Sequence, residues 1–276
     1  MPRSTIWITR PVTDLHDRLP DDFSKQVLAG SLRVVADRDN PIALNLFAAG
    51  IRELFGHLLH SAAPDDDVRA CDWFEQNPDT PTVTRRQRAI YATQGGFKTS
   101  YIESLGVDVS DLHKDAIKAI ERLNKATHVR PGRLESDPDT IEAFTQSSFE
   151  ALAGLLDSID LCQDSVREAL QDQVYDAMMI AFVTETFDTI DLLAGKGYEV
   201  DPWIDDAETH VISIGAHEVL LKFTGIAHVT LHYGNRNDAA EVQHDFPFWM
   251  TFTAPISDPT TLTLTEHHID DRAWFE

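Results

Sequence analysis

The apolar positions in the first two thirds of the chain recur at every third or fourth residue, which is the spacing of an amphipathic helix. The pattern is clearest from Pro41 to His60, and Pro41 suits the first turn of a helix. The spacing predicts helices over residues 41–60, 84–92, 100–105, 110–127 and 139–156, and one or two more between 163 and 194. Residues 1–40 carry only a weak helical signal, so we interpret them as an N-terminal extension.

After residue 208 the period of the apolar positions shortens to two, which is typical of strands. The alternation predicts strands at 211–214, 219–223, 228–233, 248–253 and 261–264, with turns at Gly215, Gly225 and Gly234. The run Ala194-Gly195-Lys196-Gly197 separates the two patterns. The predicted fold class is therefore α+β, with a helical domain over 41–196 and a small antiparallel β-sandwich-like domain over 197–276.

Composition narrows the class of protein. The chain has 276 residues and is 42% apolar, which is enough for two small domains with their own cores. It has no run near the roughly 18 apolar residues of a membrane span and no signal-peptide pattern at its start. Cys71 and Cys162 lack a CxxC partner, which excludes a zinc finger and favours buried thiols in a reducing compartment. We expect a cytoplasmic protein without a membrane partner.

The charge of the chain is distributed unevenly. The formal net charge is −23, and such an acidic surface opposes indiscriminate binding to nucleic acid. Residues 82–133 nevertheless carry ten Lys and Arg against five Asp and Glu. A basic segment in an acidic protein indicates a directed binding surface, although a solvated helical face paired with acidic neighbours gives the same pattern. The nucleic-acid-binding residues predicted from this segment are Arg85, Arg86, Arg88, Lys125 and Arg130.

One segment has the residue types needed to cleave RNA without a metal ion. A histidine can move the proton of the RNA 2′-hydroxyl, and an arginine can stabilise the extra charge on the phosphorane. His128, Arg122 and Asn124 lie within a few residues of one another and would act as acid/base, phosphate clamp and orienting group. On one ideal helix Arg122 would point about 240° away from His128, so a helix break or a dimer partner must bring them together.

A second set of polar residues lies on the helix predicted over 41–60. Glu53, His57 and His60 follow one another at i, i+4 and i+7 and therefore share a face, and Arg52 stands beside them. These residues fit a metal site, or Arg52 and Glu53 could contribute to the RNA-cleaving site from a facing helix. Packing of the histidines against neighbouring residues is the structural alternative.

The chain also resembles two known groups of proteins. The spacing from Arg122 to His128 is similar to the R-x4-6-H signature of HEPN ribonucleases, and this implies an all-helical, dimeric domain with its site at the dimer interface. Longer phrases resemble the predicted pPIWI-associating nucleases over about residues 40–276, which implies a nuclease encoded in bacterial defence contexts. These phrases include Arg52-Glu53-Leu54, Thr84-Arg85-Arg86-Gln87-Arg88, Tyr91-Ala92-Thr93-Gln94-Gly95-Gly96, Thr127-His128-Val129-Arg130-Pro131 and Phe246-Pro247-Phe248.

The sequence therefore supports a specific hypothesis with two rivals. We predict a metal-independent, HEPN-like ribonuclease that needs no cofactor and belongs to a prokaryotic defence system. It would act as a homodimer on RNA, with DNA as the alternative substrate, and alongside a partner protein. The acidic net charge favours a rival, a non-catalytic scaffold of a defence complex. A third hypothesis is an enzyme that modifies nucleic acid without cutting it.

Overall fold

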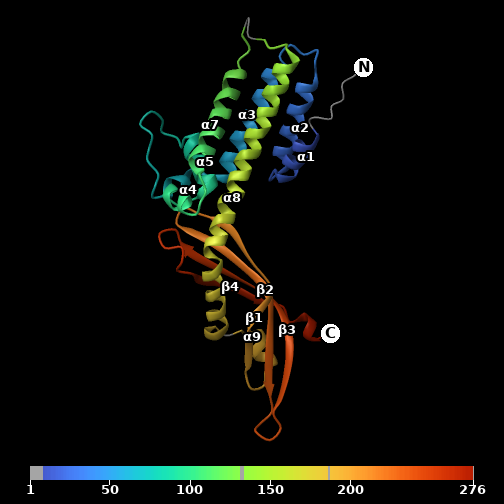
Figure 1. The fold of residues 1–276 in the computed structure, drawn as a ribbon, viewed down its shortest axis with the longest axis vertical. Helices are drawn as coiled ribbons and strands as arrows, with labels where there is room; N and C mark the ends of the chain where they lie inside the picture. The colour runs from blue at the N-terminus through green and yellow to red at the C-terminus, as the bar shows by residue number, and fades with distance from the viewer. Residues whose placement is uncertain (1–8, 131–133, 186, 276) are drawn as a thin grey trace. The chain divides into compact units, whose positions relative to one another are not determined.

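The computed structural model describes residues 9–130, 134–185 and 187–275. Contacts between Cα atoms divide the chain into two units, Met1–Cys162 and Gln163–Glu276. The first unit is helical, and the second combines helices with an antiparallel sheet, so the predicted α+β class is confirmed (Figure 1). Each unit has its own core of buried apolar residues.

The first unit is built around helix α3 (Ala43–Ala62), which packs against α2 (Asp22–Ala36), α5 (Arg85–Gln94) and α7 (Val109–Ala126) (Figure 1). Most of its apolar residues repeat at the predicted spacing and are buried, as Phe47 and Phe55 show, although Leu46 is exposed. The remaining helices of this unit are α1 (Thr9–Arg18), α4 (Asp65–Ala70), α6 (Thr99–Ser104) and the start of α8 (Pro138–Thr184).

Helices α1 and α2, which fall in the segment interpreted from the sequence as an extension, contribute to this core. Leu15 and Leu19 of α1 and Leu28 and Val35 of α2 are buried with the apolar residues of α3. Asp21 caps α2 by accepting a hydrogen bond from the Ser24 backbone N–H at 2.7 Å.

Helix α8 is one continuous element where the sequence predicts two or three. Phe149 and Leu155 of α8 belong to the core of the first unit. Val174 and Met178 of the same helix are buried in the second unit. The polar residues near the middle of α8 resemble a loop in the sequence, but a helix can carry them on its exposed side.

The second unit contains one four-stranded antiparallel sheet in the order β1-β2-β3-β4. The strands are β1 (Tyr198–Ile214), β2 (Glu218–Tyr233), β3 (Ala240–Pro255) and β4 (Thr263–Ile269), and the short elements α9 (Asp188–Leu193) and η2 (Arg272–Phe275) flank them. Alternate residues of β2 are buried, as the period of two predicts.

Helix α8, and not a second sheet, covers the apolar side of these strands in the described part of the unit. The ring of Phe182 meets Phe248 with centroids 5.0 Å apart, and Tyr175 meets Phe223 at 6.1 Å. The predicted β-sandwich is therefore wrong for the described residues. The sequence suggested a boundary near residue 196, but the contacts divide the chain after Cys162. The packing of α8 on the strands explains this difference.

Gly225 lies inside β2, opposite Phe248 of β3, and does not form the turn that the sequence predicts. A Cβ atom at this position would lie 2.4 Å from Ile204 Cγ2 and 3.2 Å from the Asp205 carbonyl oxygen. Glycine is needed here because a neighbouring strand approaches closely, which is a recognised role of glycine within a sheet. A strand with an internal glycine is difficult to distinguish from two shorter strands in the sequence.

Candidate functional site

A pocket of about 360 Å³ opens in the first unit where α7 ends. We call it the α7-end pocket. It is lined by the start of α3, the last turn of α7, the residues that follow α7 and the first turns of α8. The lining residues are Leu44, Asn45, Arg122, Lys125, Ala126, His128, Glu135, Thr140 and Phe144.

The end of α7 brings the predicted residues together. The helix ends at Ala126, whose carbonyl accepts a hydrogen bond from the Asn45 side-chain amide at 2.7 Å. This bond satisfies a carbonyl that has no partner within its own helix. His128 follows the helix end and is released from helical geometry, so it lines the same pocket as Arg122. Of the two alternatives that the sequence left open, a helix break or a dimer partner, the helix break is present within one chain.

Exposed cationic groups and a carboxylate meet in the α7-end pocket. Arg122, Lys125 and His128 are exposed, so their polar groups keep contact with solvent. Glu135 is half-buried, and its carboxylate accepts hydrogen bonds from the backbone N–H groups of Ser136 and Asp137, at 3.0 and 2.9 Å. These bonds hold the carboxylate next to the start of α8. The pocket can therefore bind an anion on one side and exchange a proton on the other.

Sequence reasoning missed Asn45 and Glu135. Asn45 is only 7% exposed, and a polar residue in an apolar helical pattern is the signal that could have identified it. Glu135 lies outside the predicted helices and carries no comparable signal.

Two models of one protein family match the chain. The family is described as predicted pPIWI-associating nuclease, and the matches cover residues 16–152 and 159–275. The chain belongs to the predicted pPIWI-associating nuclease family. No curated protein and no solved structure matches the chain. The two matches correspond closely to the two units of the fold.

Other predicted site residues of this pPIWI-associating family member lie outside the α7-end pocket. Asn124 and Arg130 are not among its lining residues, and Asn124 no longer shares a helical face with His128 because α7 has ended. Arg52 donates a hydrogen bond to the Glu53 carboxylate, with Nε and Oε1 3.1 Å apart. These two neighbours on α3 bind each other and do not line the pocket.

The three arginines at the start of α5 separate into two kinds. Thr84 and Gln87 form a capping box that fixes this helix terminus. Arg85 and Arg86 are exposed in the first turn, and no ion pair is found for either within the described residues. Arg88 is 5% exposed, and its guanidinium donates to the Ala63 carbonyl and the Asp65 carboxylate. Arg88 therefore fixes the helices together and is not placed to bind a phosphate, contrary to the sequence-based expectation.

The alternative metal-binding residues on α3 have separate partners. His57 Nε2 lies 2.7 Å from Asp21 Oδ2, and this hydrogen bond lowers the pKa of Asp21 to about 2. His60 Nδ1 is 2.7 Å from the Gly56 carbonyl oxygen, and Glu53 bonds to Arg52. Among the described residues, no group of three or more His, Cys, Asp or Glu is arranged to hold a metal ion.

The cysteines of the chain are both free and buried, as predicted. Burial raises the pKa of the Cys71 thiol to about 12 and that of Cys162 to about 11. A thiol with such a pKa is a poor nucleophile at neutral pH. Within the described part of the chain, no helical segment has both the length and the apolarity that a membrane crossing needs.

Proposed function

We propose that this chain is a ribonuclease that cleaves RNA without a metal ion or another cofactor, at the α7-end pocket. The observation that carries the proposal is the convergence of Arg122, Lys125 and His128 on one pocket that also contains Glu135. Arginine and lysine bind phosphate oxygens, and histidine and glutamate can transfer protons near neutral pH. The family supplies the general activity, that of a predicted nuclease.

The proposed reaction is an internal transfer within RNA. The 2′-hydroxyl attacks the adjacent phosphorus, and its proton passes to the Glu135 carboxylate. The bond to the 5′-oxygen of the next nucleotide breaks, and protonated His128 supplies the proton that this oxygen needs. Arg122 and Lys125 stabilise the additional negative charge of the phosphorane. The products are a 2′,3′-cyclic phosphate and a 5′-hydroxyl.

Other basic residues would guide the substrate to this pocket. Arg85 and Arg86 stand at the N-terminus of α5, where backbone N–H groups also favour phosphate. Arg130 is exposed two residues beyond His128. RNA is the proposed substrate because the reaction needs a 2′-hydroxyl; DNA is the alternative if the pocket binds strands without this chemistry.

The decisive experiment replaces the proposed acid and follows RNA cleavage by the full chain. His128→Ala should reduce the rate by about 10²- to 10⁴-fold, as is typical when a general acid or base is lost. His128 is exposed, so thermal unfolding should stay close to that of the unchanged chain. The products should end in 2′,3′-cyclic phosphate, and excess EDTA should leave the rate unchanged.

The matched control is His60→Ala, which removes an exposed histidine from the same unit. It should retain full activity under the present proposal. If activity instead disappears in EDTA, returns with manganese or zinc, and survives His128→Ala, the site belongs to Glu53, His57 and His60 on α3.

The helical unit and the spacing from Arg122 to His128 favour a HEPN-type enzyme, which we propose acts as a homodimer in the cytoplasm. Because Arg122 and His128 line one pocket within a single chain, the second copy would add positive surface and not complete this pair. Arg52, Glu53 and Asn124 are then candidates for contacts across the dimer. Light scattering should give twice the chain mass of 31.0 kDa, and a mass of 31.0 kDa would contradict the dimer.

A second candidate function is a non-catalytic scaffold of a defence complex. It is favoured by the acidity of the second unit, which has five Lys and Arg and 21 Asp and Glu. Such a surface suits a basic partner protein better than a nucleic acid. Under this alternative, purified chain would bind its partner protein but leave RNA intact, and His128→Ala would not change complex formation.

A further inference from the structure

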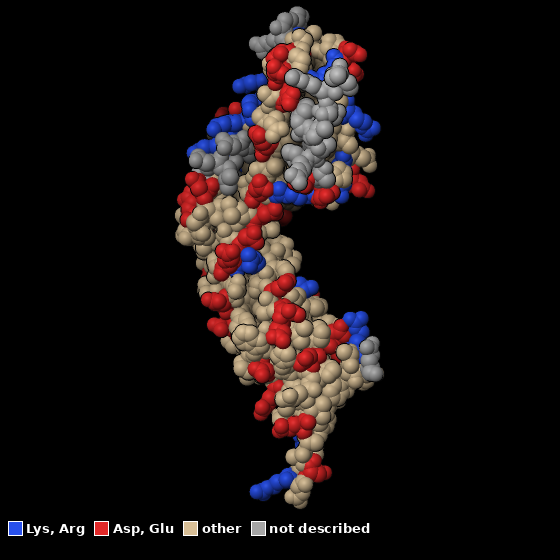
Figure 2. All heavy atoms as spheres, turned by 45° about the vertical axis from the view of Figure 1, so that its right-hand side comes forward, with Lys and Arg blue, Asp and Glu red and all other residues tan. Residues whose placement is uncertain are grey.

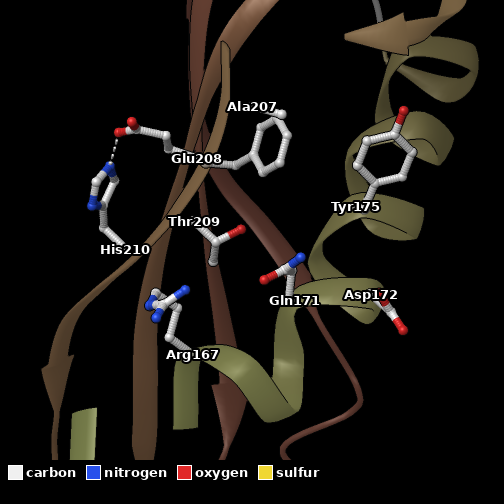
Figure 3. Close-up of a pocket in the computed structure, with 9 residues that line it drawn as sticks. Arg167, Gln171, Asp172, Tyr175, Ala207, Glu208, Thr209 and His210 are labelled. Atoms are coloured by element: carbon white, nitrogen blue, oxygen red, sulfur yellow. Dashed lines mark ion pairs between the residues drawn. The ribbon is translucent and has the colours of Figure 1, made fainter. Parts of the chain in front are cut away.

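The second unit contains its own polar pocket, which no predicted site residue lines. It lies between the later part of α8 and strand β1 and has a volume of about 460 Å³, within the usual range of small-molecule sites. We call it the α8–β1 pocket (Figure 3). Its lining residues are Arg167, Gln171, Asp172, Tyr175, Ala207, Glu208, Thr209, His210 and Phe223.

The wall formed by α8 follows from helical spacing. Arg167, Gln171 and Tyr175 are separated by four residues each, so they stand on one face of the helix, one above another. Figure 3 shows Arg167 and Gln171 of this column next to Thr209 of β1, with Tyr175 farther along the helix. The α8 wall of the pocket therefore carries the guanidinium of Arg167 and the amide of Gln171, and the hydroxyl of Thr209 lies on the β1 wall.

The aromatic end of the pocket is held rigidly. The Tyr175 hydroxyl donates a hydrogen bond to the Pro202 carbonyl at 2.6 Å. Its ring meets Phe223 edge to face at 6.1 Å, and Phe223 is the β2 residue that pairs with Thr209. A flat ligand therefore finds an aromatic surface next to the hydrogen-bonding groups of Gln171 and Thr209.

The carboxylates next to Arg167, those of Asp164 and Glu168, contact its guanidinium only at long distances. Arg167 Nε lies 3.4 Å from Asp164 Oδ1 and its Nη2 lies 3.6 Å from Glu168 Oε1, both longer than the 2.7–2.9 Å of a strong charge-assisted bond. Asp172 points away from this column in Figure 3. Glu208 and His210 bind each other at 3.3 Å, on the side of β1 opposite Thr209.

We propose that the α8–β1 pocket binds a free nucleoside monophosphate. Arg167 takes the phosphate, and the base lies along Tyr175 with its hydrogen-bonding edge toward Gln171 and Thr209. An amide is both donor and acceptor and can pair with a base edge, and aromatic side chains stack on unpaired bases. The 21 acidic residues of this unit repel a long polyanion more strongly than a ligand with one phosphate. A free nucleotide therefore fits better than a strand.

The test is calorimetric titration of the full chain with AMP, GMP, CMP and UMP in turn at low salt. We expect at least one of them to bind at one site per chain. Arg167→Gln should weaken this binding by about ten- to a hundredfold, the usual effect of losing a hydrogen bond to a charged group. Gln171→Ala, at an exposed position, should reduce the difference in affinity among the four nucleotides. The matched control is Arg236→Gln, an exposed arginine in the turn after β2, which should leave binding unchanged.

The proposal is overturned if none of the four nucleotides binds at concentrations of about 1 mM, or if Arg167→Gln binds as the unchanged chain does. Binding only of a 5′-phosphorylated single strand, lost in Arg167→Gln, would also overturn it and identify a strand end as the ligand. Matching unfolding curves for the variants exclude misfolding. Nucleotide binding is measured without cleavage, so failure of the ribonuclease proposal would leave this result standing, and the reverse also holds.

Discussion

The two units of this chain differ in charge more than in size. Residues 1–162 carry 18 Lys and Arg against 25 Asp and Glu, whereas residues 163–276 carry five against 21. On the face drawn in Figure 2, most of the basic side chains belong to the helical unit. The helical unit is thus the less acidic of the two, and the sheet unit repels a polyanion more strongly. A net charge for the whole chain conceals this division.

Each unit has its own core, and we expect the largest losses of stability from substitutions inside these cores. Such substitutions also test whether the two units unfold independently. Phe47→Ala removes a fully buried ring from the helical unit, and such a change costs about 3–5 kcal/mol. Phe252→Ala is the matched change in the sheet unit, where the ring is 1% exposed. Differential scanning calorimetry should show a different transition lowered by each variant. A single transition lowered equally by both would mean that the two units unfold as one.

The buried Arg88 tests whether the basic segment is uniform. Arg88→Ala should destabilise the helical unit by about 1–3 kcal/mol, because the Ala63 carbonyl loses its partner in a buried place. Arg85→Ala, at an exposed position in the same helix, should stay within about 0.5 kcal/mol of the unchanged chain. Urea unfolding of the two variants measures the difference. Equal effects would show that Arg88 has no structural role beyond that of its neighbours.

Charge reversal at the start of α5 tests the proposed RNA-binding surface. Arg85→Glu together with Arg86→Glu should weaken RNA binding and reduce the slope of log affinity against log salt by about two, because two phosphate contacts are lost. Fluorescence anisotropy with single-stranded RNA, measured over a range of salt concentrations, gives both quantities. The control reverses Arg236 in the sheet unit and should leave the slope unchanged. An unaltered slope in the α5 variant would show that Arg85 and Arg86 form a solvated helical face and do not bind RNA.

The smallest effect concerns acid stability of the helical unit. The hydrogen bond from His57 lowers the pKa of Asp21 from 3.8 to about 2. Since the folded pKa lies below the unfolded value, this stabilisation is present above about pH 4 and is lost as the pH falls toward 2. Asp21→Asn keeps an acceptor for the Ser24 N–H but removes the titration. The difference in Tm between the unchanged chain and Asp21→Asn should therefore shrink as the pH falls from about 4 toward 2. A constant difference would contradict the lowered pKa of Asp21.

The sequence predicts long periodic elements of this molecule well and their boundaries poorly. The helix around Phe47 and the alternation in β2 are both found, because burial on one face imposes a period that the residues display. The continuity of α8 and the inclusion of α1 and α2 in the core depend on tertiary packing, which a single sequence does not record.

The same distinction applies to the site. Arg122, Lys125 and His128 could be selected as candidates from residue type and spacing, since the proposed chemistry needs a proton-transferring group beside cationic groups. Asn45 stands out in the sequence only as a polar residue in an apolar helical pattern. Its place at the pocket depends on the packing of α3 against α7, since it precedes His128 by more than eighty residues. The burial of Arg88 was also invisible, since an arginine in a basic helix gives no sign of the Asp65 carboxylate that it meets.

Gly225 bears on how this sequence can vary. Even the smallest side chain, a methyl group, would collide with Ile204 from one neighbouring strand and crowd Phe248 from the other. Every codon change at this position that alters the amino acid is therefore unfavourable for the packing of the sheet. Related chains should keep glycine here even where the residues around it change. A saturation library selected for soluble expression should recover almost nothing else at position 225.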